Sequence, residues 1–237
     1  MNMNEQNKQP YADQLSAQER LQTAAIAMES NKLLHATDMN GKRGTNTTVD
    51  LQVVEELIQD WPTLSKKVTQ KMIEFYGPPN DTTHSTIVWY YNGPWKKTIV
   101  YKEGVPHDFP EPHVDMLEQF IDYHVPAYKA GEIAKLEGSL VIDRTRGEVS
   151  VHCDNEGANT LSMNMMHEIV TGKRTAEEAR EKIAEQITEF LMNRPAPYAE
   201  KFQFELPQKE QVDPDVTIVK DEELMQAVES AKKELNL

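Results

Sequence analysis

Three histidines and several carboxylates occur close together in the middle of the chain. His107, His113 and His124 flank a segment that also carries Asp115, and His152 follows further along. Imidazole nitrogens and carboxylate oxygens are ligands for divalent transition metals such as zinc, manganese or iron. These residue types therefore indicate a candidate metal site drawn from His107, His113, Asp115, His124 and His152.

The spacing of these residues gives the metal hypothesis little support. A helical metalloprotease motif needs His-Glu-x-x-His, and His167-Glu168 is not followed by the second histidine. Within the helix that we expect to begin at His113, residues 113 and 115 point in nearly opposite directions, because neighbours two apart share no helix face. The objection weakens if His113 only flanks that helix. The alternative is that the histidines bond loop carbonyls or face water.

The single cysteine, Cys153, excludes an internal disulfide and a cysteine-rich zinc site. Adjacent side chains of a strand point to opposite faces, so Cys153 and His152 are not expected to form a thiolate–imidazole pair. A buried structural thiol is the favoured interpretation. The sequence also lacks the Gly-x-Ser-x-Gly elbow and both glycine-rich phosphate loops. We therefore expect no cofactor, with a divalent transition metal as the alternative.

The strongest local signal is a β-hairpin. The runs Thr86–Tyr91 and Lys96–Tyr101 are β-branched and aromatic, and Asn92-Gly93 between them is a favoured hairpin turn. Because Pro94 and Trp95 lengthen the connection, we expect a loop of about three to five residues.

The hairpin also concentrates side chains that bind proteins. Alternation places Trp89 and Tyr91 on one side of the strand, and exposed tryptophan and tyrosine favour protein contacts. Lys96 and Lys97 add positive charge next to Trp95. We expect Trp89, Tyr91, Trp95, Lys96 and Lys97 to form a binding surface. The alternative places a tryptophan in the core and the lysines in solvent.

Helical spacing of apolar residues occurs at several places. It predicts a helix around Val53–Ile58 with Asp50 as its N-cap, and a second helix capped by Ser65 that stops at Gly77. A third helix is expected over about His113–Tyr123. A loop should cover Glu103–Pro112 because of its three prolines.

The remaining elements complete an α+β fold with a small antiparallel sheet of about five strands, covered by helices mainly on one face. Helix or strand patterns are read as follows: a helix over Tyr128–Leu136, strands over Ser139–Asp143 and Gly147–His152, a helix from Asn155 or Asn159 to Gly172, a helix after the capping box Thr175–Glu178, and a last strand over Lys201–Leu206.

The chain should divide into three parts. Residues 1–48 are polar and poor in large apolar side chains, which predicts a partly disordered extension. Residues 49–206 form the single α+β domain. Residues 207–237 are an acidic linker and an amphipathic tail helix, with Leu224, Val228, Ala231 and Leu235 at helical spacing.

Composition narrows the classes of partner. The 237 residues include 39 acidic and 25 basic side chains, and the formal net charge is −14. Nucleic-acid and anionic-lipid binding both depend on clustered lysine and arginine, so neither partner is expected. No apolar run approaches the roughly 20 residues that span a bilayer, and the first residues do not resemble a secretory signal. We expect a cytoplasmic protein.

Several segments resemble an uncharacterised bacterial protein family. They include the hairpin segment Trp-Tyr-x-Asn-Gly-Pro-Trp-Lys within Val88–Tyr101 and the loop Pro-His-x-Phe-Pro-x-Pro-His within Val105–His113. The resemblance extends over about Gln59–Leu206. No activity, ligand or catalytic residue is known for that family, so the resemblance implies no function.

Two functions follow from these patterns. The first is a non-catalytic protein-interaction module that binds a protein partner or itself through the aromatic hairpin. The second is a metal-dependent, hydrolase-like enzyme that uses the histidine and aspartate cluster. The absence of any specific catalytic motif favours the first.

Overall fold

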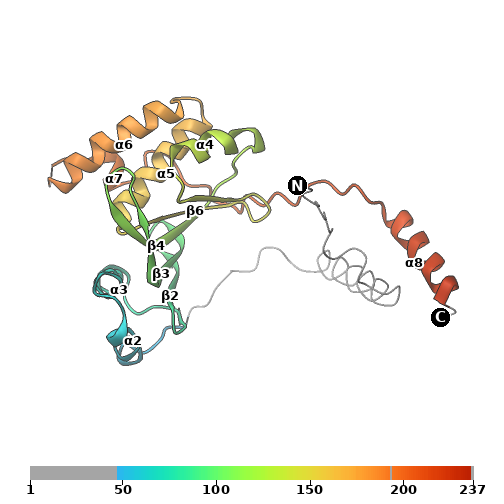
Figure 1. Cartoon of the computed structure of the whole chain (residues 1–237), viewed down its shortest axis with the longest axis horizontal. Coiled ribbons are helices and arrows are strands. Elements are labelled where there is room, and N and C mark those ends of the chain that lie inside the picture. Colours follow the sequence, from blue (N-terminus) through green and yellow to red (C-terminus); the bar gives the residue numbers. More distant parts are fainter. Residues whose placement is uncertain (1–46, 193, 236–237) are drawn as a thin grey trace, which may run out of the picture. The chain divides into compact units, whose positions relative to one another are not determined.

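The computed structural model describes residues 47–192 and 194–235 (Figure 1). Contacts group Gly44–Asp215 into one compact unit, and the helix α8 (Asp221–Leu235) lies outside that unit. The tail helix was expected, and it is present. The predicted N-terminal extension falls almost wholly outside the described residues. No described helix combines the length and the apolar character needed to cross a membrane.

A six-stranded antiparallel sheet forms the centre of the compact unit, which confirms the α+β class with one strand more than expected. The strand order is β1-β2-β3-β4-β6-β5. The strands are β1 (Asp81–Thr82), β2 (Thr86–Asn92), β3 (Trp95–His107), β4 (His113–Asp122), β5 (Leu140–Asp143) and β6 (Glu148–Cys153).

The β2–β3 hairpin is confirmed, but its loop is shorter than expected. Asn92 pairs with Trp95, so only Gly93 and Pro94 connect the strands. Gly93 takes a φ of +58°, a conformation that glycine adopts at little steric cost. Strand β3 then continues to His107, so the loop expected over Glu103–Pro112 is restricted to residues 108–112.

The helix expected over about His113–Tyr123 is wrong, because this segment is the central strand β4. It pairs with β3 on one side and with β6 on the other. Residues 116–119 are all buried, so the strand is covered on both faces and shows no simple alternation. A short apolar run of this kind fits helical spacing equally well.

Helices pack on the sheet in two groups (Figure 1). α3 lies against β2 and β3, whereas α5 lies against β4 and β6. The helices of the compact unit are α2 (Leu51–Leu57), α3 (Thr63–Tyr76), α4 (Ala130–Leu136), α5 (Glu156–Val170), α6 (Ala176–Leu191) and α7 (Pro197–Glu200), with 3-10 turns at Ile58–Asp60 and Ala127–Lys129.

The helix ends agree with most of the predicted caps. Asp50 caps α2, Asn155 caps α5, and Thr175 with Glu178 forms the capping box of α6. The predicted cap at Ser65 is wrong, because α3 begins earlier, after Pro62. Ser65 is buried inside α3 and donates its hydroxyl to the carbonyl of Lys102 on β3.

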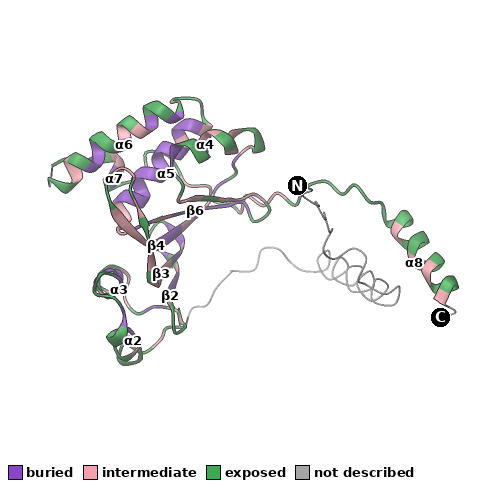
Figure 2. Cartoon of the chain, in the orientation of Figure 1, coloured by how far each residue is buried: buried purple, intermediate pink, exposed green. Residues whose placement is uncertain are grey.

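Buried residues form two hydrophobic clusters beneath the helices (Figure 2). One lies around α4, α5 and α6 and includes Trp95 and Met165. The other joins α2 and α3 to the sheet through Trp61, Trp89 and Leu117. These clusters hold β3 and β4 in place and so fix the residues at their ends.

The strand expected over Lys201–Leu206 is also wrong. The segment is irregular, although Phe202, Phe204 and Leu206 pack against the larger cluster. The side chain of Asn164 donates to the carbonyl of Lys201 and accepts from the amide of Gln203. A side chain therefore pairs with this backbone where a neighbouring strand was expected.

Candidate functional site

The adjoining ends of β3 and β4 bring three candidate ligands together. His107, the last residue of β3, pairs with His113, the first residue of β4. Directly paired residues of an antiparallel sheet share a face, and so do residues two apart in one strand. Asp115 therefore projects to the same side as His113. The strand assignment removes the objection that a helix would send His113 and Asp115 in opposite directions.

The donor atoms of the three side chains converge. Asp115 Oδ2 lies 3.2 Å from His107 Nδ1, and Asp115 Oδ1 lies 3.0 Å from His113 Nε2. One nitrogen or oxygen from each of the three residues lies within 4.8 Å of those of the other two. The side chain of Asp115 is only 10% exposed. We call His107, His113 and Asp115 the triad.

The ring of His113 is oriented by a backbone hydrogen bond. Its Nδ1 lies 2.7 Å from the carbonyl oxygen of Glu111, which can only accept, so Nδ1 carries a proton. In the neutral ring, Nε2 then presents its lone pair to the carboxylate of Asp115. Two lone pairs 3.0 Å apart repel one another unless a proton or a cation lies between them.

Two buried polar atoms of the triad lack a hydrogen-bond partner. Among the described residues, eight buried side-chain nitrogen or oxygen atoms have no partner. His107 Nδ1 and Asp115 Oδ1 are two of them, because their contacts are close but not aligned as hydrogen bonds. Glu137 Oε1 and Ser139 Oγ are two more. Buried polar groups are nearly always paired, so the two unpartnered atoms of the triad need a physical reason.

Electrostatics link Glu137 to the triad. Burial raises the pKa of Glu137 to about 7, and the nearby carboxylate of Asp115 adds to this rise, against opposing effects of Ser162, His113 and Arg180. Burial also raises the pKa of Asp115, although His107 and His113 act in the opposite direction. Both carboxylates are thus stabilised poorly as anions by the protein alone.

The triad has the composition and spacing of a metal centre with open positions. Two histidines and one carboxylate form the ligand set of many non-haem iron sites, and three protein ligands are typical of catalytic zinc. With metal–ligand bonds of about 2.1 Å, adjacent ligand atoms lie about 3.0–3.4 Å apart. The separations of 3.0 Å to Asp115 Oδ1 and 3.2 Å to Asp115 Oδ2 fall within this range.

The two other predicted ligands do not join the triad. His124 is exposed and lies two residues beyond Asp122, at the end of β4 opposite to His113. At about 3.3 Å per residue, β4 itself spans roughly 30 Å. His152 on β6 pairs instead with Glu118, its cross-strand partner on β4.

His152 belongs to a second polar cluster, formed with Tyr101, Glu118 and Ser150. Glu118 accepts hydrogen bonds from the hydroxyls of Tyr101 at 2.5 Å and Ser150 at 2.6 Å, and His152 Nε2 lies 3.3 Å from it. The other nitrogen, His152 Nδ1, lies 3.3 Å from the carbonyl of Ser139. We call these four residues the Glu118 cluster.

The pKa values in the Glu118 cluster favour a charged pair. Burial raises the pKa of Glu118, but hydrogen bonds from His152, Ser150 and Tyr101 outweigh it and lower the net value. Burial lowers the pKa of His152, but Glu118 outweighs it and raises the net value. Burial and Glu118 together raise the pKa of Tyr101, which stays a neutral donor.

The hairpin residues predicted to bind a partner are mostly engaged within the fold. Trp89 and Trp95 are each 1% exposed and belong to the core, so neither can contact a partner while the hairpin is folded. Lys96 is buried and forms ion pairs with Asp122 and Glu148, the latter at 2.7 Å. Lys97 lies over the ring of Phe120 at 3.7 Å.

Of the five predicted contact residues, Tyr91 alone is largely exposed, at 51%. The protein-interaction function stays a prediction, but the surface proposed for it is corrected: its tryptophans and Lys96 are parts of the interior. Cys153 is buried and free, as expected, and burial raises the pKa of its thiol well above the usual value. A thiol of this kind is a poor nucleophile.

Sequence reasoning assigned no role to Glu137, Tyr101 and Glu118. Glu137 follows a short helix and precedes Gly138, where nothing in the spacing marks it. Tyr101 lies in the predicted hairpin, and Glu118 lies in the segment predicted to be a helix. The pairing of β3 with β4 brings these two side chains together.

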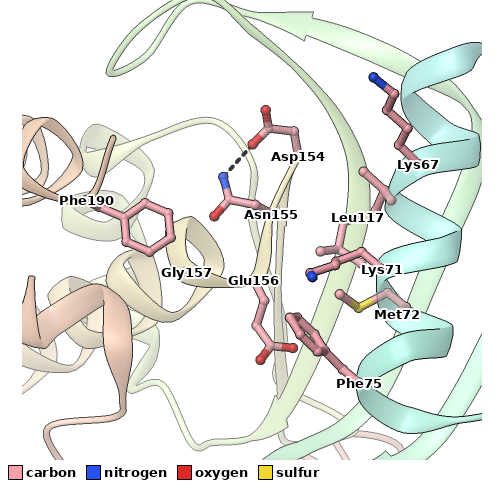
Figure 3. A pocket seen from close by; sticks show the side chains of 11 residues that line it. Lys67, Lys71, Met72, Phe75, Leu117, Asp154, Asn155, Glu156, Gly157 and Phe190 are labelled. Carbon is pink, nitrogen blue, oxygen red and sulfur yellow. Dashed lines mark hydrogen bonds between the residues drawn. The ribbon is translucent and has the colours of Figure 1, made fainter. Parts of the chain in front are cut away.

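A pocket of about 410 Å³ lies between α3 and the start of α5 (Figure 3). Its lining is mostly apolar and includes Met72, Phe75, Leu117 and Phe190. Figure 3 shows the lysines of α3 on one side, and Asp154 and Glu156 on the other. Opposite charges on facing walls of an apolar pocket point to no single ligand chemistry, so the triad is the better candidate.

No protein-family model matches the chain, and neither the curated proteins nor the solved structures contain a significant match. The resemblance to an uncharacterised bacterial family therefore stays a prediction. Any function has to be argued from the side chains themselves.

Proposed function

We propose that this protein is a metal-dependent enzyme of the hydrolytic type, in which His107, His113 and Asp115 hold a divalent transition-metal ion. One observation carries the proposal. The hydrogen bond from His113 Nδ1 to the carbonyl of Glu111 turns the lone pair of Nε2 toward Asp115 Oδ1, 3.0 Å away and without hydrogen-bond geometry. A cation between these atoms satisfies both.

The ligand types support a transition metal over magnesium or calcium. Magnesium and calcium prefer oxygen ligands, whereas imidazole suits zinc, iron, cobalt, nickel and copper. Two of the three ligands here are imidazoles. The bond from His113 to the Glu111 carbonyl is also the outer contact that orients metal-bound histidines in many proteins.

The number of ligands supports catalysis over a structural role. Structural zinc sites are closed by four protein ligands, whereas catalytic sites use three and keep a position for water or substrate. The described part of the chain offers three converging ligands at this place. A metal ion with a free position activates water or polarises a carbonyl or phosphoryl oxygen, which are the steps of hydrolysis.

The competing interpretation is that the triad is a structural ion pair, with one or both imidazoles protonated. It predicts that the three residues are held together by protons and have no affinity for metal. It also predicts that substitutions of the histidines and of Asp115 lower the free energy of unfolding in a non-additive way. Both consequences differ from those of the proposal and are measurable.

Metal content is the direct test. Untagged protein, purified without added metal, is analysed by elemental analysis, and protein stripped with a chelator is then dialysed against cobalt(II). We expect about one equivalent of metal per chain in the dialysed sample. His113→Ala should lose this binding, whereas His124→Ala, which removes an exposed histidine at the far end of β4, should keep it.

Two results would reject the proposal. One is less than about a tenth of an equivalent of any transition metal in both the purified and the dialysed protein. The other is equal binding by His113→Ala and His124→Ala, which would place the metal elsewhere. Circular dichroism of both variants shows whether they are folded.

The proposal also covers the class of substrate and the cellular compartment of the enzyme. The acidic composition supports a site that does not act on nucleic acid, and the single buried thiol supports the cytoplasm as the compartment. Self-association or a protein partner is compatible with a metal centre at the β3–β4 end and stays a separate prediction.

A further inference from the structure

The register between β3 and β4 changes once along the pair. Val100 pairs with Leu117, whereas Val105 pairs with Asp115. Four residues of β3, Tyr101–Gly104, therefore stand opposite a single residue of β4. Extra residues in one strand of an antiparallel pair form a β-bulge, and bulges are common beside active sites because they redirect side chains. We call Tyr101–Gly104 the bulge.

The bulge decides which residue lies opposite His113. If the register before the bulge continued to the end of β3, His113 would lie opposite Gly104 and not opposite His107. Val100 shares the face of Asp115, because the β4 partner of Val100 is two residues from Asp115. His107 lies an odd number of positions after Val100, so a regular strand would turn it to the other face. The bulge thus brings His107 to the side that carries His113 and Asp115.

Helix α3 holds the bulge in place. Ser65 of α3 is 2% exposed, and its hydroxyl donates to the carbonyl of Lys102 at 2.8 Å. The amide of Lys102 donates to the carbonyl of Ser85, also at 2.8 Å. At the first residue of the bulge, the hydroxyl of Tyr101 donates to Glu118 at 2.5 Å. The bulge is therefore fixed by groups on both sides of the sheet.

Gly104 closes the bulge against β4. A Cβ at this position would overlap Cγ1 of Val114 and would lie 3.1 Å from the carbonyl oxygen of Asp115. Carbon atoms in favourable contact are about 3.5–4.0 Å apart. A side chain on residue 104 would therefore push β3 away from β4 next to Asp115. Glycine in a strand often marks such a close approach of two backbones.

We propose, resting on the metal centre proposed above, that the bulge sets the register that assembles the triad and that Ser65 is the positioning residue that holds it. Ser65 acts through the backbone of Lys102. Without its hydroxyl, the bulge loses a bond that fixes its place along β4. A register shift of one residue turns every following side chain of β3, including His107, to the other face.

A purely structural role for Ser65 makes a different prediction. Ser65→Ala would then lower the stability of the fold and leave the metal affinity of the folded protein unchanged. Thr69 provides the matched control. It is fully buried on the same helix, and its hydroxyl donates to the carbonyl of Ser65 at 2.9 Å, within α3. Thr69→Val removes a buried hydroxyl from α3 and leaves the bond to Lys102 in place.

Cobalt affinity tests the positioning role. Wild type, Ser65→Ala and Thr69→Val are stripped with a chelator and titrated with cobalt(II) while the visible spectrum is recorded. Ser65→Ala should bind cobalt about 10-fold more weakly than the wild type, an effect typical of losing a contact that supports metal ligands. Thr69→Val should bind as the wild type does. Urea unfolding shows that each variant is folded.

A second pair of variants tests the bulge at its other end. Gly104→Ala should lower the cobalt affinity by about 100-fold, because it separates the strands beside Asp115. Gly131→Ala on α4 is its control, since nothing lies within 4 Å of a Cβ there, and it should bind as the wild type does. The inference is overturned if folded Ser65→Ala or Gly104→Ala binds cobalt as tightly as the wild type, or if the controls weaken binding equally.

NMR of the metal-free protein separates this inference from the metal centre. Cross-strand contacts in the wild type should place Val105 beside Asp115. Ser65→Ala and Gly104→Ala should weaken or shift these contacts and keep the pairing before the bulge. Unchanged contacts in both variants would overturn the inference. Absence of cobalt binding by the wild type rejects the metal centre itself, and the NMR contacts then decide whether the bulge sets the register.

Discussion

The triad and the Glu118 cluster both have a carboxylate on β4 and are built from similar groups, yet they are paired in opposite ways. In each, a buried carboxylate on β4 faces an imidazole: Asp115 faces His113, and Glu118 faces His152. Every oxygen of Glu118 receives a hydrogen bond from the protein. Asp115 Oδ1 receives none.

The difference separates a structural cluster from a ligand site. A buried polar group without a partner destabilises the fold by about 1–3 kcal/mol, so such groups persist mainly where function requires them. The Glu118 cluster meets its hydrogen-bonding needs from within the chain. Asp115 Oδ1 of the triad lacks such a partner among the described residues.

The largest expected effect is on stability without metal. Glu118→Gln should lower the free energy of unfolding by about 3 kcal/mol, because it breaks a buried charged pair and weakens the bonds from Tyr101 and Ser150. Asp115→Asn should leave the free energy unchanged or raise it, because the new amide can donate to His113 Nε2. Urea unfolding in the presence of a chelator measures both.

These two isosteric variants are controls for each other. If Asp115→Asn destabilises the metal-free protein as much as Glu118→Gln does, the triad is an ion pair of the same structural kind. The contrast between the two clusters then disappears, and with it the argument for a ligand.

A slightly smaller effect is expected from metal binding. At a free metal concentration 100 times Kd, a single site stabilises the folded state by about 2.7 kcal/mol. Wild type, His124→Ala and Glu118→Gln should each gain this amount, since none of the changes removes a triad ligand. His107→Ala should gain almost none. Thermal unfolding with and without zinc detects the difference, and an equal gain in His107→Ala would contradict the assignment.

The smallest effect concerns pH. A raised pKa for His152 in the folded state means that its pairing with Glu118 stabilises the fold fully below the unfolded value near 6.5 and fades as pH rises through the folded value. The lowered pKa of Glu118 means that its share is present above 4.5 and is lost as pH falls.

The stability difference between wild type and His152→Gln should therefore be greatest between about pH 4.5 and 6.5 and decline above that window. The groups around His152 are Glu118, Tyr101, the Ser139 carbonyl and, through its charge, Asp115. Urea unfolding in chelator at several pH values gives the profile. A difference independent of pH would mean that His152 and Glu118 form no charged pair.

Local signals predicted much of the fold. The hairpin, the capping box at Thr175 and the caps at Asp50 and Asn155 depend on residues a few positions apart, so they were readable from the chain. The strand β4 and the irregular segment after Lys201 were misread. Their conformations depend on partners distant in sequence: β3 and β6 in one case and the side chain of Asn164 in the other.

The residue types of the candidate site were predicted from the sequence. The helical periodicity assigned to residues 113–123 hid the alignment of these side chains. His107, His113 and Asp115 were named as ligands, but a helix separates His113 from Asp115, whereas a strand aligns them. His124 was included because it is near in sequence, and β4 carries it to the far end of the sheet. Glu137 lies at the end of α4, and the spacing of residues in the sequence does not show what surrounds it in the fold.

The position of a bound metal tests the central claim most directly. Crystals of the wild-type protein grown or soaked with cobalt(II) should give an anomalous scattering peak at about 2.1 Å from His107 Nδ1, His113 Nε2 and a carboxylate oxygen of Asp115. An occupied cobalt peak at another place, with none between these three side chains, would contradict the account.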